Sequence, residues 1–368
     1  MPVYRGHRSY VGEKMIRHSV IIPTSNHPSL LHRCLATLRK AKRPTAEYEV
    51  LVMDNSEEAY RSENLLVTAS FNDDRFRYVP MEDWGLMAAR HLGVEMARGH
   101  IVSFIDDDSF VSDTWFLGIE ESLNNSNVVL VTGPNRPEYE ITPPDWLDYF
   151  CTKTENGHYM VYLSLLDFGD TIQEIEPTFV WGCNYSIRKE IFYAVKGSHP
   201  DYLPPQWRKY QGDGEVGLSV KVAALGFEVR YCPKCAIRHL VPASRMTLDY
   251  LGARAFIFGI EDSFRRARRE HGLGPSEGVA MDPEARQVTL YRQLRLWASK
   301  TWIGSIKRNL FPSKESLIEP PEVVEIRHHL KKCFANGWTF HRHALHNDPK
   351  LKEYVLRPNY MGENAKIR

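Results

Sequence analysis

Short β-branched runs alternate with helical patterns over roughly the first 130 residues, and this alternation constrains the fold more than any other sequence feature. Residues 19–23 (SVIIP) and 48–54 (YEVLVMD) are too compact for helices, and they flank a helical pattern over 29–40. The same order recurs, with predicted strands at 76–80, 100–105 and 128–132 and predicted helices at 85–98 and 113–123. This alternation predicts an α/β fold with a mostly parallel sheet covered by helices on both faces. The ligand crevice of such a sheet lies beyond the carboxyl ends of its strands.

The rest of the chain divides into an irregular middle and a helical end. Residues 134–211 are rich in Pro and aromatic side chains and contain one clear strand, near 179–187, so we expect functional loops there. Next come a predicted helix over 214–225, a strand pair at 228–231 and 236–239, and helices over 248–271, 283–310 and 322–334. We therefore predict an α/β domain over residues 1–240 and a helical accessory region over residues 241–368.

The overall charge argues against one class of partner. Lys and Arg number 47 against 46 Asp and Glu, and a net charge of +1 disfavours a nucleic-acid binder held by a broad basic field. The charge is unevenly distributed, because residues 241–368 hold 22 basic and 14 acidic side chains, whereas residues 1–240 hold 25 and 32. The basic tail suggests a separate role or contact with an anionic partner or membrane surface.

Cysteine usage and the N-terminus point to the cytoplasm. The six cysteines are too few and too scattered for a disulfide scaffold, and residues 1–17 lack the apolar segment of a secretory signal. No window approaches ~18 uninterrupted apolar residues, so we expect no ordinary transmembrane helix. Cys232 and Cys235 have the spacing of a zinc or redox site, but no second pair accompanies them, and we interpret the spacing as coincidental.

Three consecutive carboxylates, Asp106, Asp107 and Asp108, follow the predicted strand at 100–105. Adjacent carboxylates repel one another unless a cation or donor groups offset their charge. Hard oxygen ligands suit Mg²⁺ or Mn²⁺, which is typically shared with a substrate diphosphate. The run therefore predicts a metal site, and the alternative is a solvated acidic turn in which Asp caps a helix.

Other local motifs narrow the class of enzyme. Asp54 ends the second predicted strand, where nucleotide-binding sheets place an acceptor for ribose or base, although Asp-Asn-Ser is also a common turn. The first strand is not followed by Gly-x-Gly-x-x-Gly, and Gly-Lys-Ser/Thr is absent from the sequence. These absences disfavour a dinucleotide dehydrogenase and a P-loop enzyme.

Five blocks of sequence, taken in order, carry a resemblance to a known family. They are SVIIPTSNHPSLLHRCLATL, YEVLVMDNS, GLMAARHLGVEMARGHIVSFIDDD, WGCNYSIRKEIF and GDGEVGLSVKVAALGFEVRYCPKCAIRH, and they span roughly residues 18 to 240. This set resembles glycosyltransferase family 2 with the GT-A fold. The resemblance implies inverting transfer of a sugar from a nucleoside-diphosphate sugar, with Mn²⁺ or Mg²⁺ as cofactor. A UDP-sugar is favoured as the commonest donor, and the acceptor hydroxyl is not identified.

The same resemblance implies roles for individual donor-site residues. The nucleoside cradle would consist of Pro23, Thr24, Ser25, Asn26 and Asp54. Arg90 is expected near the diphosphate, because its guanidinium suits phosphate oxygens. Asp106 would contact the ribose, with Asp107 beside it. Asp108 and His239 would bind the metal. The alternatives are a solvated helix charge for Arg90 and a satisfied core histidine for His239.

The catalytic base is expected in residues 212–215 (GDGE), which resemble the family's Glu-Asp-x-Glu block. Inverting transfer needs a carboxylate opposite the departing diphosphate, where it takes the proton of the acceptor hydroxyl. The preferred candidate is Asp213 at a predicted helix start, where the helix dipole favours the ionised form. Glu215 competes for this role because Gly212 replaces the family's Glu, and a simple helix cap is the alternative for Asp213.

Trp181 and Asn184 are predicted to lie near the transferred sugar. A Trp face stacks on a sugar ring, and an Asn amide can donate to and accept from hydroxyls. A buried core Trp is the competing interpretation.

The tail leaves several interpretations open. Phe256, Ile257, Phe258 and Ile260, followed by the arginines of 265–269, could lie on an anionic lipid surface, as could residues 291–310. Ordinary packing of an amphipathic helix is the favoured interpretation. The tail could also mediate a homodimer. The alternative functions are a nucleotidyltransferase that acts on a sugar phosphate and a non-catalytic protein that keeps the GT-A fold.

Overall fold

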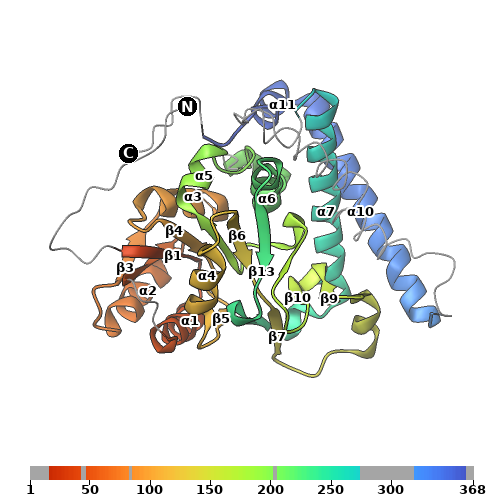
Figure 1. The fold of residues 1–368 in the computed structure, drawn as a ribbon. Helices are drawn as coiled ribbons and strands as arrows, with labels where there is room; N and C mark the ends of the chain where they lie inside the picture. The colour runs from red at the N-terminus through yellow and green to blue at the C-terminus, as the bar shows by residue number, and fades with distance from the viewer. Residues whose placement is uncertain (1–15, 43–46, 83–84, 202–204, 274–318, 362–368) are drawn as a thin grey trace.

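The computed structural model describes residues 16–42, 47–82, 85–201, 205–273 and 319–361 (Figure 1). Its centre is an eight-stranded sheet. The strand order is β11 (Gln173–Glu174), β13 (Glu228–Tyr231), β6 (Val128–Thr132), β12 (Tyr185–Arg188), β4 (Ile101–Phe104), β1 (Ile16–Thr24), β2 (Glu47–Asp54) and β3 (Phe76–Pro80). Strands β1, β2, β3 and β4 pair in parallel, and β12 runs antiparallel between β4 and β6. The predicted mixed, mostly parallel sheet is therefore confirmed.

Helices lie on both sides of this sheet (Figure 1). They are α1 (Pro28–Lys40), α2 (Glu58–Ser70), α3 (Leu86–Met96), α4 (Trp115–Leu123), α5 (Lys189–Ala194) and α6 (Gly214–Ala224). In α1, Pro28 occupies the first turn, where its missing N–H costs nothing, and Leu31, Leu35 and Leu38 form a buried stripe. Helix α2 was missed from the sequence, since its Leu65 and Leu66 are exposed and break the amphipathic pattern.

A second sheet occupies the segment that was expected to be loops. Its order is β5 (Ser109–Val111), β14 (Ile237–Val241), β7 (Asn135–Tyr139), β10 (Leu165–Asp167), β9 (Gly157–Met160) and β8 (Thr152–Thr154). The predicted strand pair at 228–231 and 236–239 is wrong as a pair, because β13 joins the first sheet and β14 joins the second. The short helix η5 (Pro233–Cys235) turns the chain between them and buries Cys235.

Strand register brings the ends of β1, β2 and β4 to one edge. Thr24 pairs with Asp54, and Ile21 pairs with Phe104, so the chain after Phe104 emerges beside the last residues of β1. Strand β14 then pairs with β5, which places His239 opposite Ser109. This geometry brings the acidic run and His239 together, although more than 130 residues separate them in the sequence.

The C-terminal helices α7 (Leu248–Glu270) and α10 (Pro321–Asn347) run side by side, and α11 (Pro349–Val355) follows them (Figure 1). Leu251 and Phe258 of α7, with Ile326 and Leu330 of α10, belong to the same buried cluster as the sheet. The predicted helices 248–271 and 322–334 are found here, α10 being longer than expected, whereas 283–310 lies outside the described residues. The domain boundary at residue 240 remains a prediction.

Part of the surface considered for membrane contact packs inside the protein in α7. Phe258 and Ile260 are buried. Arg268 is also buried, and its guanidinium donates to the carbonyl oxygens of Val355, Arg357 and Pro358. These groups are used within the protein, so α7 packs as an amphipathic helix. Arg266 and Arg269 of the same helix are exposed, and contact with a membrane stays a prediction. Within the described residues, no helix combines the length and the apolar character needed to cross a membrane.

Close contact between α7 and α10 depends on Gly337, and we expect Gly337→Ala to destabilise the protein. An added Cβ would lie 1.9 Å from the carbonyl oxygen of Phe256, so the helices must separate. The strain should lower the free energy of unfolding by about 1–3 kcal/mol, measured by urea denaturation. The exposed neighbour Asn336, changed to Ala, is the control, and equal stability of both variants would contradict the packing argument.

Candidate active site

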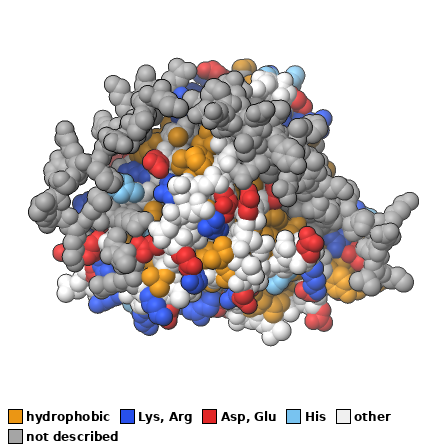
Figure 2. All heavy atoms as spheres, in the orientation of Figure 1, with side chains coloured by type: hydrophobic (Ala, Val, Ile, Leu, Met, Phe, Trp, Pro, Cys, Tyr) orange, Lys and Arg blue, Asp and Glu red, His pale blue; other side chains and the backbone are white. Residues whose placement is uncertain are grey.

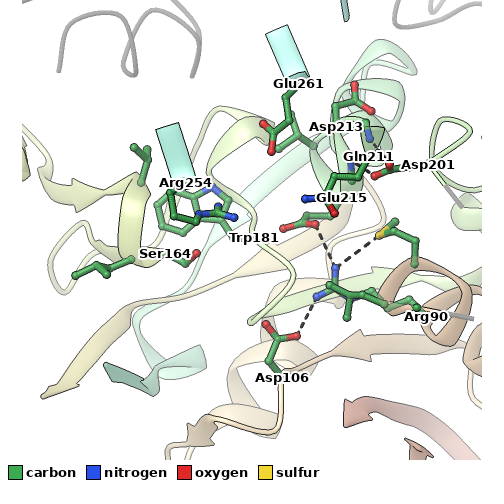
Figure 3. A pocket seen from close by; sticks show the side chains of 18 of the residues that line it. Arg90, Asp106, Ser164, Trp181, Asp201, Gln211, Asp213, Glu215, Arg254 and Glu261 are labelled. Atoms are coloured by element: carbon green, nitrogen blue, oxygen red, sulfur yellow. Dashed lines mark hydrogen bonds and ion pairs between the residues drawn. The ribbon is translucent and has the colours of Figure 1, made fainter. Parts of the chain in front are cut away.

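A cavity of about 360 Å³ lies beyond the carboxyl end of β4, between the two sheets and α7 (Figure 3). Seven of the predicted site residues line it: Arg90, Asp106, Asp108, Trp181, Asp213, Glu215 and His239. Pro23, Thr24, Ser25, Asn26, Asp54, Asp107 and Asn184 are not among its lining residues. The cavity therefore gathers the residues predicted for the diphosphate, the metal and catalysis.

Arg90 bridges two walls of this cavity (Figure 3). Its guanidinium donates to Asp106 Oδ1 at 2.9 Å and to Glu215 Oε2 at 3.2 Å. The Arg90 side chain is only 3% exposed, whereas those of Asp106 and Glu215 are 33% and 25% exposed. Because both terminal nitrogens of its guanidinium contact carboxylates, Arg90 joins the two walls instead of offering a free fork to a phosphate.

Gly182 permits this arrangement. A Cβ at this position would lie 2.2–2.4 Å from the Arg90 guanidinium, so no other residue fits without moving the arginine. The Gly182 N–H also donates to Glu215 Oε1 at 2.9 Å. The preceding residue, Trp181, lines the cavity, and its indole N–H donates to the carbonyl oxygen of Thr178. Gly182 thus fixes Glu215, and Trp181, which is 5% exposed, packs in the core and also lines the cavity.

Asp108, His239 and Arg245 form a second charged group. Arg245 donates to Asp108 Oδ2 at 2.8 Å, and His239 Nε2 lies 3.4 Å from Asp108 Oδ1. Burial disfavours the Asp108 carboxylate, but the imidazole and the guanidinium outweigh it and lower the pKa of Asp108 to about 2. Asp108 is therefore ionised across the physiological range.

Two atoms in this group suit a divalent cation. Asp108 Oδ1 is buried, and no hydrogen-bond donor of the described residues satisfies it. His239 Nδ1 lies 3.0 Å from the Leu163 carbonyl oxygen, which can only accept, so Nδ1 carries a proton. When the ring gives up its second proton, Nε2 has a lone pair available to a cation. The described residues hold no cluster of three or more His, Cys, Asp or Glu ligands. Mg²⁺ or Mn²⁺ bound by one or two protein ligands plus phosphates and water fits this donor set.

Asp213 and Glu215 differ in what they present to the cavity. Asp213 is buried, its side chain being 1% exposed, and its carboxylate contacts His199 Nδ1 at 3.0 Å. Burial opposes ionisation of Asp213, but the His199 contact lowers its pKa below the usual value. Glu215 directs both oxygens at the cavity wall beside Arg90. Of the two base candidates, Glu215 is the more accessible.

Asp201 fixes the backbone of the segment that carries Asp213 and Glu215. Its oxygens accept the N–H groups of Gly212 and Gly214, so it fixes the turn before α6. Burial, with the nearby negative charge of Asp213, raises the pKa of Asp201 to about 8. A carboxylic acid that stays largely protonated near neutral pH therefore supports the start of α6.

The residues expected in the nucleoside cradle lie at the adjoining edge of the sheet. Asp54 is fully buried and accepts hydrogen bonds from the Ser56 N–H, Asn64 and Tyr78. Its expected direct contact with the nucleoside is therefore corrected: Asp54 orders the loop after β2. Pro23 is buried and Ser25 is exposed.

The neighbouring loop after β1 is held by two further contacts. Thr24 Oγ1 donates to Asp107 Oδ2 at 2.6 Å, which ties the end of β1 to the acidic run. Asn26 has a φ of 61°, and its backbone N–H donates to Ser56 Oγ. These contacts join the loops that follow β1, β2 and β4.

The prediction for Asn184 is wrong. Its side chain is buried, accepts from Trp115 Nε1, and donates to Asn135 Oδ1 and the Cys235 carbonyl oxygen. All its hydrogen-bonding capacity is used within the core, so it braces the junction of the two sheets and leaves nothing for a sugar.

Sequence reasoning missed several cavity residues. They are Asp201, Arg208, Gln211, Arg245, Tyr250, Arg254 and Glu261. Tyr250, Arg254 and Glu261 come from α7, and Figure 3 shows Arg254 beside Trp181. No local motif marks these residues. The exception is Arg245, which lies shortly after the strand that carries His239 and could have been predicted from that position.

Comparison with known proteins agrees with this arrangement. Residues 19–196 match the family model described as Glycosyl transferase family 2. Glucosyl-dolichyl phosphate glucuronosyltransferase of Haloferax volcanii is 24% identical over 211 residues, which are 56% of this chain and 63% of that protein. Succinoglycan biosynthesis protein ExoM of Rhizobium meliloti is 24% identical over 251 residues, 68% of this chain and 74% of that protein. The chain thus spans less than two thirds of the first relative.

Solved structures show the same fold. Mannosyltransferase PcManGT from Pyrobaculum calidifontis, in complex with GDP-Man and Mn²⁺, has a TM-score of 0.51 at 17% identity. The superposition covers 92% of this chain and 85% of that chain. GalNAc-T7 with UDP, GalNAc and Mn²⁺ has a TM-score of 0.50 at 16% identity, with 80% and 58% coverage. The predicted resemblance and the GT-A fold class are confirmed.

The shifted Asp201 carboxyl predicts a pH dependence of stability. Its pKa is near 4 unfolded and about 8 folded, so between these values the folded state binds the extra proton. Stability should therefore fall as pH rises through this window, and Asp201→Asn should flatten the fall in thermal melts. The exposed Asp170, changed to Asn, is the control, and identical slopes for wild type and Asp201→Asn would rule the assignment out.

Proposed function

We propose that this chain, whose residues 19–196 match glycosyl transferase family 2 and whose fold is GT-A, transfers a sugar with inversion from a nucleoside-diphosphate sugar to an acceptor hydroxyl. The proposal rests on the cavity, in which Asp106 and Asp108 lie on one wall and Glu215 lies on the other. Buried Arg90 joins the two walls. A donor placed between these walls has its leaving group on the acidic side and its anomeric carbon towards Glu215.

The donor side is built for a nucleotide at the edge of the parallel sheet. The loops after β1 and β2 adjoin the acidic run through the Thr24–Asp107 hydrogen bond. This continuity supports a nucleoside over these loops and the diphosphate at Asp106 and Asp108. Two structural neighbours hold UDP in one case and GDP-Man in the other, and we keep a UDP-sugar as the proposed donor.

A divalent cation, Mn²⁺ or Mg²⁺, fits Asp108 and His239. Bound there, it would supply positive charge that offsets the charge building on the departing diphosphate. Asp106 has a different task, because its contact with Arg90 leaves one carboxylate edge exposed towards the cavity. That edge can accept a hydrogen bond from a ribose hydroxyl.

Glu215 is the proposed base. It accepts the proton of the acceptor hydroxyl while the acceptor oxygen bonds to the anomeric carbon, and the bond from that carbon to the diphosphate breaks with its electron pair on the phosphate oxygen. Gly182 and Arg90 hold the carboxylate in place, so little reorganisation is needed at the moment of transfer. Trp181 offers an apolar face against which a sugar ring can stack.

The acceptor side is completed by α7. Tyr250, Arg254 and Glu261 line the cavity, so the helical region contributes to acceptor binding. A glycan, a lipid-linked sugar and a small metabolite all supply the required hydroxyl. The cytoplasmic location stays a prediction from the sequence.

On the face shown in Figure 2, acidic and basic side chains are interspersed. That the protein has no nucleic-acid partner stays a prediction.

The first test is donor turnover. Incubation with a panel of UDP-, GDP- and dTDP-sugars and Mn²⁺ should slowly release one nucleoside diphosphate without acceptor, measured by chromatography. Asp108→Asn should abolish the metal-dependent part of this release, whereas the exposed Asp113, changed to Asn, should not. The proposal fails if purified protein neither binds nor hydrolyses any member of the panel.

The second test separates the two base candidates. Glu215→Gln keeps a hydrogen-bonding side chain but cannot take a proton, so we expect transfer to fall by about 10²- to 10⁴-fold with donor affinity nearly unchanged. Asp213→Asn should lower transfer less, since its carboxylate faces His199. The assignment is reversed if Asp213→Asn loses transfer to this extent and Glu215→Gln does not.

A further inference from the structure

Arg245 lies against the two groups that fit the metal. It ends the short helix η6 (Ala243–Arg245), which follows the strand carrying His239. Its guanidinium donates to Asp108 Oδ2 at 2.8 Å and lies 3.4 Å from His239 Nε2. The backbone supports this arrangement, because the Leu240 N–H donates to the Asp108 carbonyl oxygen. The guanidinium therefore contacts both proposed cation ligands at once.

The Arg245 guanidinium and a divalent metal ion cannot both lie close to Asp108 and His239. A guanidinium keeps its charge at every physiological pH and has donors only, so it satisfies Asp108 in the way a metal would. A divalent ion bound to the same carboxylate would be repelled by the guanidinium at short range. Metal entry at Asp108 and His239 therefore requires the Arg245 side chain to move away.

The accessibility of the three side chains shows which of them can move. The Arg245 side chain is 31% exposed, whereas Asp108 is 10% and His239 6% exposed. Arg90, the other arginine on the acidic wall, is 3% exposed and held between Asp106 and Glu215. Arg245 can leave its partners for the cavity, and Arg90 cannot.

We propose that Arg245 is an exchangeable cation of the donor site: it holds Asp108 and His239 before metal binds, is displaced by the metal, and then pairs with the donor diphosphate. The last step rests on the proposed function. Because displacement costs Arg245 its carboxylate partner, metal alone binds weakly, and a diphosphate that gives the freed guanidinium a new partner strengthens metal binding. Arg245 is thus a positioning residue that couples metal binding to donor binding.

The test is Mn²⁺ affinity of the full chain without nucleotide, measured by the loss of the free-Mn²⁺ electron paramagnetic resonance signal. Arg245→Gln should bind Mn²⁺ about 5- to 150-fold more tightly than wild type, the usual range of such couplings. Arg245→Lys keeps the charge and should stay close to wild type. The matched control is Arg238→Gln, an arginine of the same strand as His239 that is 61% exposed and paired with Glu138.

A second titration in the presence of UDP or GDP tests the coupling. Nucleoside diphosphate should strengthen Mn²⁺ binding more in wild type than in Arg245→Gln. Equal or weaker Mn²⁺ binding by Arg245→Gln without nucleotide, in protein whose circular dichroism matches wild type, would overturn the proposal. If no nucleoside diphosphate binds to either protein, the proposed function and the diphosphate step fail, while the nucleotide-free comparison still decides whether Arg245 competes with metal.

Discussion

The buried Arg90 bridge is the interaction on which the site depends. It joins Asp106, at the end of a parallel strand, to Glu215, at the start of a helix from a distant part of the chain. A buried ion pair does little for net stability, since desolvation offsets the attraction between its charges. Its value here is positional, because buried Arg90 contacts a carboxylate on each wall at once. The bridge therefore sets the distance between the wall that holds Asp106 and the wall that holds Glu215.

The second sheet and the helical region form a cavity at the carboxyl edge of the parallel strands. Strand β14 brings His239 and Arg245 to Asp108, and α7 closes the far side with Arg254 and Glu261. Because α7 and α10 share the buried cluster of the sheet, the helical region is part of the site's architecture. The two arginines on the acidic wall therefore differ. Arg90 is buried and fixes the geometry of the site, whereas Arg245 is partly exposed and can exchange partners.

Parts of the site were predictable because their chemistry is local. An acidic run after an apolar strand places Asp106 and Asp108 at the sheet edge, since parallel strands end together. Asn184 and Asp54 show the limit of this reasoning. Both carry the residue type expected of a sugar or nucleoside ligand, yet both are surrounded by donors and acceptors of the core. Sequence alone does not reveal which polar groups fold inward, because the partners lie far away along the chain.

The sequence by itself determined the α/β alternation, most strands of the central sheet and the position of the acidic run, because hydrophobic periodicity and turn residues act over a few neighbouring positions. Only the tertiary structure decided that residues 134–241 contribute a second sheet and that α7 lines the cavity. It also decided that Glu215 faces the cavity while Asp213 turns to His199. These outcomes depend on pairing and burial between segments distant in the chain, and long-range packing leaves no periodic signal in the residues that take part.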